Sequence, residues 1–200
     1  MRPLRTFDRW CVSGVLLALL SLPACGSSQP TTAANRAVVP DYDQTTGRLQ
    51  RLASDSNRDG KIDTWGYMDG MRLVRVEVDE DGDGQVDRWE YYARDQSGSS
   101  ANTREAATPE RIERSTRHDG NVSRWEYFDR GVLVRVEEDA DGDGQLDKWE
   151  TYRGGALMTL ALDTEHRGKP NRRLIYKTDG SLERIEADPT GSGEFRELGR

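Results

Sequence analysis

Two stretches of the chain carry the same pattern of residues. Residues 65–90 read WGYMDGMRLVRVEVDEDGDGQVDRWE, and residues 125–150 read WEYFDRGVLVRVEEDADGDGQLDKWE. Each contains an aromatic segment, a Gly-containing turn, an alternating aliphatic segment and an acidic loop. Period-two alternation with β-branched and aromatic residues indicates strands, and a Gly between such segments favours a hairpin turn. The pattern therefore predicts one β-hairpin and one acidic loop per unit.

The unit recurs with a period of 24 residues. Its markers are Gly60, Gly84, Gly120, Gly144 and Gly168. One interval is 36 residues long instead of 24, because the loop-like segment 94–109 contains an insertion of 12 residues. A fixed period is typical of arrays in which each unit packs on its neighbours. We expect residues 38–200 to form an all-β domain, an antiparallel meander or solenoid of hairpin repeats with about 10–12 short strands.

Residues 1–24 have the features of a secretory signal peptide. Three Arg residues precede a short apolar segment. The following Leu22-Pro23-Ala24-Cys25 resembles a bacterial lipobox. This resemblance implies cleavage before Cys25, lipidation of that residue and attachment to a membrane of the bacterial cell envelope. The outer membrane is favoured because Gly26, and not Asp, follows the cysteine. Residues 25–37 would be the lipidated cysteine and a flexible linker. An ordinary signal peptide cut nearby is the alternative, and it also implies export.

The chain is acidic and poor in apolar residues. Hydrophobic residues make up 34 % of it, and 36 acidic against 29 basic residues give a net charge of −7. This balance argues against a nucleic-acid partner, and the composition argues against a large dry core. Cys11 would leave with the signal peptide, so lipidation of Cys25 would leave no cysteine for a disulfide. We therefore expect another kind of cross-link to hold the fold.

The acidic loops match the loop that binds calcium in EF-hands. Loop 2 (residues 79–87) and loop 4 (residues 139–147) have Asp at positions 1, 3, 5 and 9 and Gly at position 6, and Glu follows at position 12. Calcium takes 6–8 oxygen ligands, which alternate side chains of a curled loop can supply. Loop 1 (residues 55–63) keeps most of these donors but has Gly66 at position 12. We therefore predict two bound Ca²⁺ ions, with loop 1 as a candidate third site. The candidate ligands are Asp79, Asp81, Asp83, Gln85, Asp87 and Glu90 in the first set, Asp139, Asp141, Asp143, Gln145, Asp147 and Glu150 in the second, and Asp55, Asn57, Asp59, Lys61 and Asp63 in the third.

Comparison of the repeats leaves some of these assignments open. Glu126 occupies position 12 after loop 3 (residues 115–123), which has lost donors, so Glu90 and Glu150 could instead be ordinary strand residues. Loop 3 has lost donors at positions 1 and 3 and gained positive charge, and loop 5 (residues 163–171) has Arg at position 5. We therefore expect neither loop to bind calcium. The strand-like flanks resemble calcium repeats of the thrombospondin type, and the hairpins resemble MORN-like repeats. The alternative to metal binding is that the loops are only Asp/Gly-rich turns.

These features favour a non-enzymatic, lipid-anchored calcium-binding protein of the bacterial envelope, in which calcium stabilises the repeat array. The alternative is an envelope scaffold that binds a protein or polysaccharide through its aromatic and Arg columns, with calcium incidental. No catalytic constellation stands apart from the repeats, so an enzyme is not expected. We expect the aromatic columns to pack between units and the Arg column to pair with Glu or lie over aromatic rings. His118 and His166 are expected to be solvated surface residues.

Overall fold

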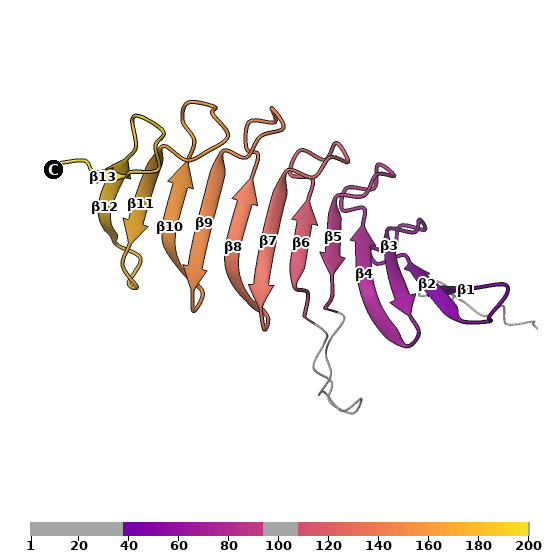
Figure 1. The fold of residues 1–200 in the computed structure, drawn as a ribbon. Coiled ribbons are helices and arrows are strands. Elements are labelled where there is room, and N and C mark those ends of the chain that lie inside the picture. Colours follow the sequence, from indigo (N-terminus) through magenta and orange to yellow (C-terminus); the bar gives the residue numbers. More distant parts are fainter. Residues whose placement is uncertain (1–37, 94–107, 200) are drawn as a thin grey trace, which may run out of the picture. The chain divides into compact units, whose positions relative to one another are not determined.

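The computed structural model of the protein describes residues 38–93 and 108–199. These residues form one antiparallel sheet of 13 strands, in which each strand pairs with its neighbours in the sequence (Figure 1). The expected all-β meander of hairpin repeats is confirmed, as a single open sheet. The strands are β1 (Val39–Tyr42), β2 (Leu49–Ser54), β3 (Thr64–Asp69), β4 (Arg72–Val78), β5 (Arg88–Tyr91), β6 (Arg111–Arg114), β7 (Arg124–Asp129), β8 (Val132–Glu138), β9 (Lys148–Arg153), β10 (Ala156–Leu162), β11 (Arg172–Tyr176), β12 (Leu182–Ala187) and β13 (Arg196–Glu197).

Three predicted segments lie outside the described residues. They are the signal peptide of residues 1–24, Cys25 with its linker up to residue 37, and the insertion of residues 94–109 apart from its last two residues. Within the described ranges, no helix is long and apolar enough to cross a membrane.

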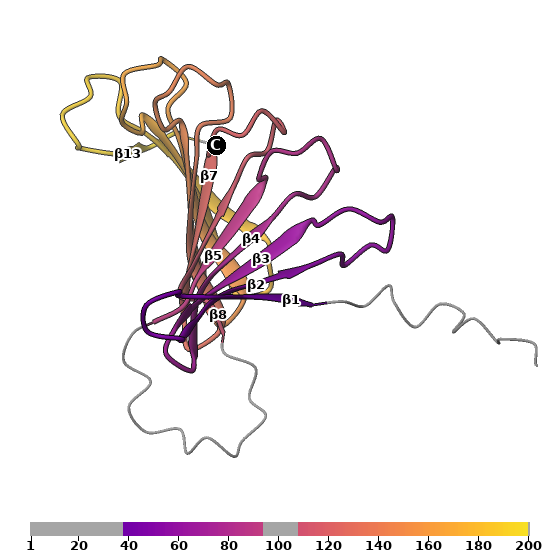
Figure 2. The same cartoon turned by 90° about the vertical axis from the view of Figure 1, so that its right-hand side faces the viewer.

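The meander places two kinds of connection at the two opposite ends of the strands (Figure 1). Tight turns join β3 to β4 and β7 to β8, where Gly70 and Gly131 have φ of +68° and +77°. Such positive φ values suit glycine, as the sequence pattern predicts. Loops 1 to 5 lie at the other end of the strands, because every second connection of an antiparallel meander returns to the same end. Figure 2 shows each strand rotated relative to the one before it, as expected for a twisted sheet.

One face of the sheet, the aromatic face, carries two rows of alternating residues. In the first row Trp65 pairs with Glu77, and Glu77 pairs with Trp89. In the second row Tyr67 pairs with Arg75, and the same alternation continues as far as Arg135. The guanidinium groups lie 4.0–4.3 Å from the tyrosine ring centroids in three pairs, Arg75–Tyr67, Arg111–Tyr91 and Arg135–Tyr127. The repeat register predicts an Arg column that contains Arg75, Arg114 and Arg135. Its expected contact with aromatic rings is confirmed for Arg75 and Arg135, but Arg111 takes the place of Arg114, which pairs with glutamates instead.

The opposite face, the aliphatic face, alternates aliphatic side chains with glutamates. The residue Val136 of β8 lies between Glu126 of β7 and Glu150 of β9 in the register. Val136 is fully buried and Ile112 is 8 % exposed. Only four apolar side chains of the described residues are buried, Val78, Ile112, Val136 and Ala161. The core is thus thin, because a single sheet has no second layer to pack against.

We expect Val136→Ala to destabilise the fold by about 2 kcal/mol, because it removes buried methyl groups and leaves a cavity. Val132→Ala on the same strand is the control, since Val132 is 44 % exposed. That variant should stay within about 0.5 kcal/mol of the wild type. Urea unfolding followed by tryptophan fluorescence measures both changes. Equal losses in the two variants would contradict the assignment of Val136 to the core.

Candidate metal centres

The loops close through hydrogen bonds from their own backbone. In loop 2, the side chain of Asp79 at position 1 accepts hydrogen bonds from the amides of Gly82 and Gly84, at 2.7 and 2.9 Å. Asp87 at position 9 accepts one from the amide of Glu80, at 2.9 Å. Loop 4 repeats this arrangement through Asp139 and Asp147. Positions 1 and 9 thus hold the loop in its curled form.

The same curled form does not require a carboxylate at both position 1 and position 9. In loop 3, Ser115 Oγ accepts a hydrogen bond from the amide of Asp119 at 3.1 Å, and Ser123 Oγ accepts one from the amide of Thr116 at 3.0 Å. In loop 5, Asn171 takes the role of the residue at position 9. Neutral side chains therefore suffice at position 9 in two loops and at position 1 in one. The extra carboxylates of loops 2 and 4 are not needed to build the turn.

The carboxylates of loops 2 and 4 converge. One oxygen from each of Asp79, Asp81 and Asp83 lies within 4.8 Å of the others, and so do oxygens of Asp139, Asp141 and Asp147. Buried members anchor each set, since Asp79 is 6 % exposed and Asp139 is 5 % exposed. Converging carboxylate oxygens are the donor type that a hard dication such as Ca²⁺ prefers. These sets contain predicted ligands from positions 1, 3, 5 and 9.

The glutamates at position 12 are held by strand partners. Glu150 is 9 % exposed, and it accepts a hydrogen bond from the Tyr152 hydroxyl at 2.7 Å and pairs with Lys148 at 3.0 Å. Burial opposes ionisation of Glu150, but these hydrogen bonds outweigh it and lower its pKa. Burial, followed by the contact with Glu150, raises the pKa of Tyr152 to about 12. Glu90 has equivalent partners in Tyr92, at 2.5 Å, and Arg88. Both glutamates thus belong to the ion-pair network of the aliphatic face.

Loop 1 has the same curled form with fewer carboxylates. Asp55 accepts hydrogen bonds from the amides of Arg58 and Gly60. Asn57 stands at position 3 and accepts one from the amide of Asp59. Loops 1 and 2 together line a pocket of about 240 Å³ that includes Asp59, Asp63 and Asp83. Loop 1 brings fewer than three carboxylates together, so it is the weaker candidate. Lys61, Gln85 and Gln145 stand at position 7, where an EF-hand loop contributes its backbone carbonyl.

Both histidines lie against an acidic loop. His118 at position 4 of loop 3 places Nδ1 3.0 Å from Asp87 Oδ1, and His166 at the same position of loop 5 places Nδ1 2.8 Å from Asp141 Oδ2. Both have φ of +53°, the conformation that Gly82 adopts at position 4 of loop 2. The expectation of solvated surface histidines missed these contacts. The signal in the sequence is that each histidine has the same loop position and follows a complete acidic loop.

Loop 3 also contributes positive charge to loop 4. Arg117 donates a hydrogen bond to the backbone carbonyl of Asp139 at 3.2 Å, and its guanidinium lies 3.9 Å from the Asp139 carboxylate. Loop 3 thus contacts the acidic loops on both sides, through His118 and Arg117.

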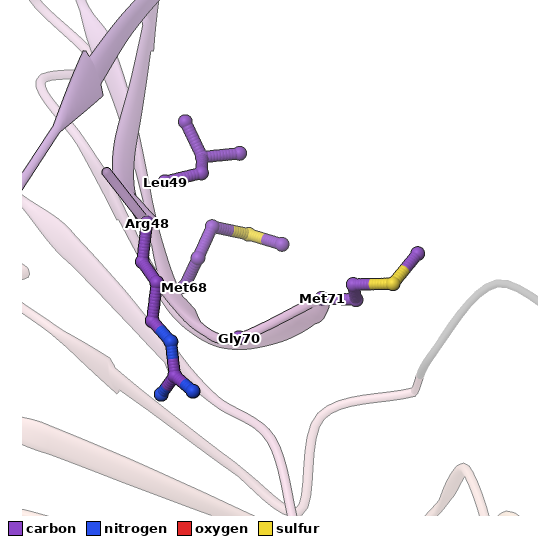
Figure 3. Close-up of a pocket in the computed structure, with 5 residues that line it drawn as sticks. All are labelled: Arg48, Leu49, Met68, Gly70 and Met71. Atoms are coloured by element: carbon purple, nitrogen blue, oxygen red, sulfur yellow. The ribbon is translucent and has the colours of Figure 1, made fainter. Parts of the chain in front are cut away.

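A separate apolar pocket lies beside the tight turn between β3 and β4, at the end of the strands opposite to the acidic loops (Figure 3). It has a volume of about 610 Å³ and includes Leu49, Met68, Gly70 and Met71. Met71 lies in the β3–β4 turn and is 99 % exposed. This pocket therefore lies at the end of the strands that carries the tight turns, away from the acidic loops.

No protein-family model matches the chain, and no curated protein matches its sequence.

The carboxylate at position 9 of loop 1 ties folding to pH. Asp63 is 4 % exposed and accepts hydrogen bonds from the amides of Ser56 and Asn57 and from the Thr64 hydroxyl. Burial works to raise the pKa of Asp63, but these hydrogen bonds outweigh it and hold the pKa below its ordinary value. The charged form of Asp63 is therefore favoured in the folded protein.

The free energy of unfolding should decrease as the pH falls through and below the ordinary Asp range near about 3.9. The sign follows because a lowered pKa means that the folded state binds fewer protons than the unfolded chain there. Asp63→Asn should make this decrease shallower. Urea unfolding of both proteins from pH 7 to pH 3 measures the effect. Parallel pH profiles would contradict the role given to Asp63.

Proposed function

We propose that the protein is a lipid-anchored calcium-binding repeat protein of the bacterial cell envelope, in which calcium stabilises the array. One observation carries the calcium part of the proposal. Loops 2 and 4 bring three carboxylates within 4.8 Å, whereas loop 3 builds the same turn with Ser115 and Ser123. The carboxylates of loops 2 and 4 are thus in excess of what the turn needs.

Electrostatics supports a dication at these loops. Two carboxylates at such a separation repel each other by about 1–3 kcal/mol, depending on how strongly solvent screens them. The folded state bears this repulsion until a cation neutralises it. Ca²⁺ suits the loops better than Mg²⁺, since Mg²⁺ usually keeps several waters and demands near-ideal octahedral geometry.

The anchoring part of the proposal rests on the sequence of residues 1–25. Its basic start, short apolar segment and Leu22-Pro23-Ala24-Cys25 motif support export and lipidation. Envelope location also fits the calcium role, because a lipidated Cys25 leaves the protein dependent on cross-links other than disulfides.

The alternative is a scaffold that binds a protein or polysaccharide through the aromatic face. The half-buried rows of Trp and Tyr on this open face favour it. However, Arg75, Arg111 and Arg135 are each engaged with a tyrosine ring and a glutamate of their own strand. This engagement gives the Arg column a structural role that needs no partner. Glycan or pull-down binding that is indifferent to chelator would favour the scaffold.

Calcium should raise the melting temperature of the purified protein, and a chelator should lower it. Binding to the folded state alone stabilises it by about 2.7 kcal/mol at a free concentration of 100 times the Kd. The double variant Asp81→Asn/Asp141→Asn should lose most of the shift. Asp119→Asn, at position 5 of loop 3, is the matched control and should retain it. Differential scanning calorimetry with calcium and with chelator measures all three proteins, and an unchanged wild-type melting temperature would refute the calcium role.

The anchor has its own test. The full chain expressed in bacteria should incorporate radiolabelled palmitate and enter the detergent phase in Triton X-114 partitioning. Cys25→Ala should abolish both, because the lipidated thiol is lost. Labelling that persists in this variant would place the modification elsewhere, and an unlabelled, aqueous wild type would contradict the anchor.

A further inference from the structure

A cluster of three side chains spans loops 2 and 3. Nδ1 of His118 lies 3.0 Å from Oδ1 of Asp87 and 3.8 Å from Oδ2 of Asp81. One ligand atom from each of the three residues lies within 4.8 Å of the other two. The cluster therefore combines an imidazole nitrogen from one loop with two carboxylates from its neighbour.

The Asp87 carboxylate has an unsatisfied oxygen in this cluster. Asp87 is 1 % exposed, and its Oδ2 accepts the hydrogen bond from the amide of Glu80. Its Oδ1 is buried and, within the described residues, accepts no hydrogen bond. Nδ1 of His118 is close to it but outside hydrogen-bond geometry. A buried carboxylate oxygen without a hydrogen bond is costly, so an unfilled oxygen aimed at an imidazole nitrogen points to a bound cation.

We propose that Asp81, Asp87 and His118 bind a transition-metal dication of the zinc class. Zn²⁺ takes imidazole nitrogen and carboxylate oxygen at about 2.0–2.2 Å, and tetrahedral geometry then separates the ligand atoms by about 3.3 Å. The two separations that involve Nδ1 of His118, 3.0 and 3.8 Å, bracket that value, and the ligand atoms of the three residues all lie within 4.8 Å of one another. Ca²⁺ instead prefers oxygen ligands, so the nitrogen of His118 favours zinc at this cluster. A water completes the fourth position.

This ion would link two loops, whereas calcium would bind within one. Asp81 can serve both, because its Oδ1 accepts a hydrogen bond from the amide of Asp83 inside loop 2 while its Oδ2 is directed to His118. Zinc and calcium would then compete for Asp81. The zinc proposal does not depend on the calcium proposal, since Asp81, Asp87 and His118 form the zinc site without the other carboxylates of loop 2.

Loop 4 provides a matched comparison. Asp141, Asp143 and His166 form a similar group, but all three are exposed. Within the described residues, no buried carboxylate oxygen of loop 4 lacks a hydrogen bond. The guanidinium of Arg117 also lies beside this loop, 3.9 Å from Asp139. We therefore expect this group to bind zinc more weakly than the His118 cluster.

The test is titration of the purified protein with ZnCl₂ in calcium-free buffer by isothermal calorimetry, with Co²⁺ absorption as a spectroscopic readout. The wild type should bind one tight equivalent of Zn²⁺ and give the intense d–d bands of tetrahedral Co²⁺. His118→Gln should lose this equivalent and the bands, and Asp87→Asn should weaken binding by more than the about 10–100-fold typical of losing an outer partner of a metal ligand. His166→Gln should retain both readouts. His118 is half exposed, so its replacement should leave the fold intact, as circular dichroism would verify.

Tight zinc binding that survives His118→Gln would overturn the proposal, and so would absence of binding to the wild type. Equal losses in the two histidine variants would assign binding to exposed histidines individually and would also overturn it. The calcium-dependent melting shift of His118→Gln separates the two proposals. A calcium shift with no zinc binding refutes the zinc site alone, and zinc binding that requires His118 without any calcium shift refutes the calcium role alone.

Discussion

The arrangement of the acidic loops depends on main-chain hydrogen bonds that join the base of each loop to the base of the next. The amide of Asp79 donates to the carbonyl of Asp63 at 2.9 Å, and the amide of Ser115 donates to that of Asp87 at 2.7 Å. Equivalent bonds join loop 3 to loop 4 and loop 4 to loop 5. They continue the ladder of the sheet beyond the strands. Consecutive loops are therefore held two strand spacings apart, about 10 Å, which a side chain from one loop can span.

This spacing lets the loops complement one another in charge. Loops 2 and 4 are strongly acidic, and loops 3 and 5 carry Arg117, His118, His166 and Arg167. A loop that carries basic side chains thus follows each complete acidic loop. His118 and Arg117 contact loops 2 and 4 from the loop between them. The charges of loops 2 to 5 therefore repeat over two hairpins, whereas the strands repeat with every hairpin.

The sequence was sufficient for the hairpins, because alternation and turn glycines are local signals. It also predicted the Arg–Tyr contacts and the carboxylates that converge in loops 2 and 4, since these follow from repeat register. It left the environment of Glu90 and Glu150 open, because position in a motif does not show which partners a strand residue meets. The contact between His118 and Asp87 depends on a positive φ at position 4 and on loop-to-loop distance. Neither is visible within one loop, although Gly82 and Gly142 at the same position hint at the first.

The two ends of the sheet have a consequence for assembly. A single open sheet has two edge strands, whose unpaired amides and carbonyls can recruit a strand from another chain. At one edge, β1 contains Pro40, which has no amide hydrogen to donate. At the other, β13 is only two residues long, Arg196 and Glu197, and both are charged. The two terminal strands thus offer a poor template for pairing between chains, and at the C-terminal end it is Leu182–Arg184 of β12, which β13 does not cover, that present an open edge.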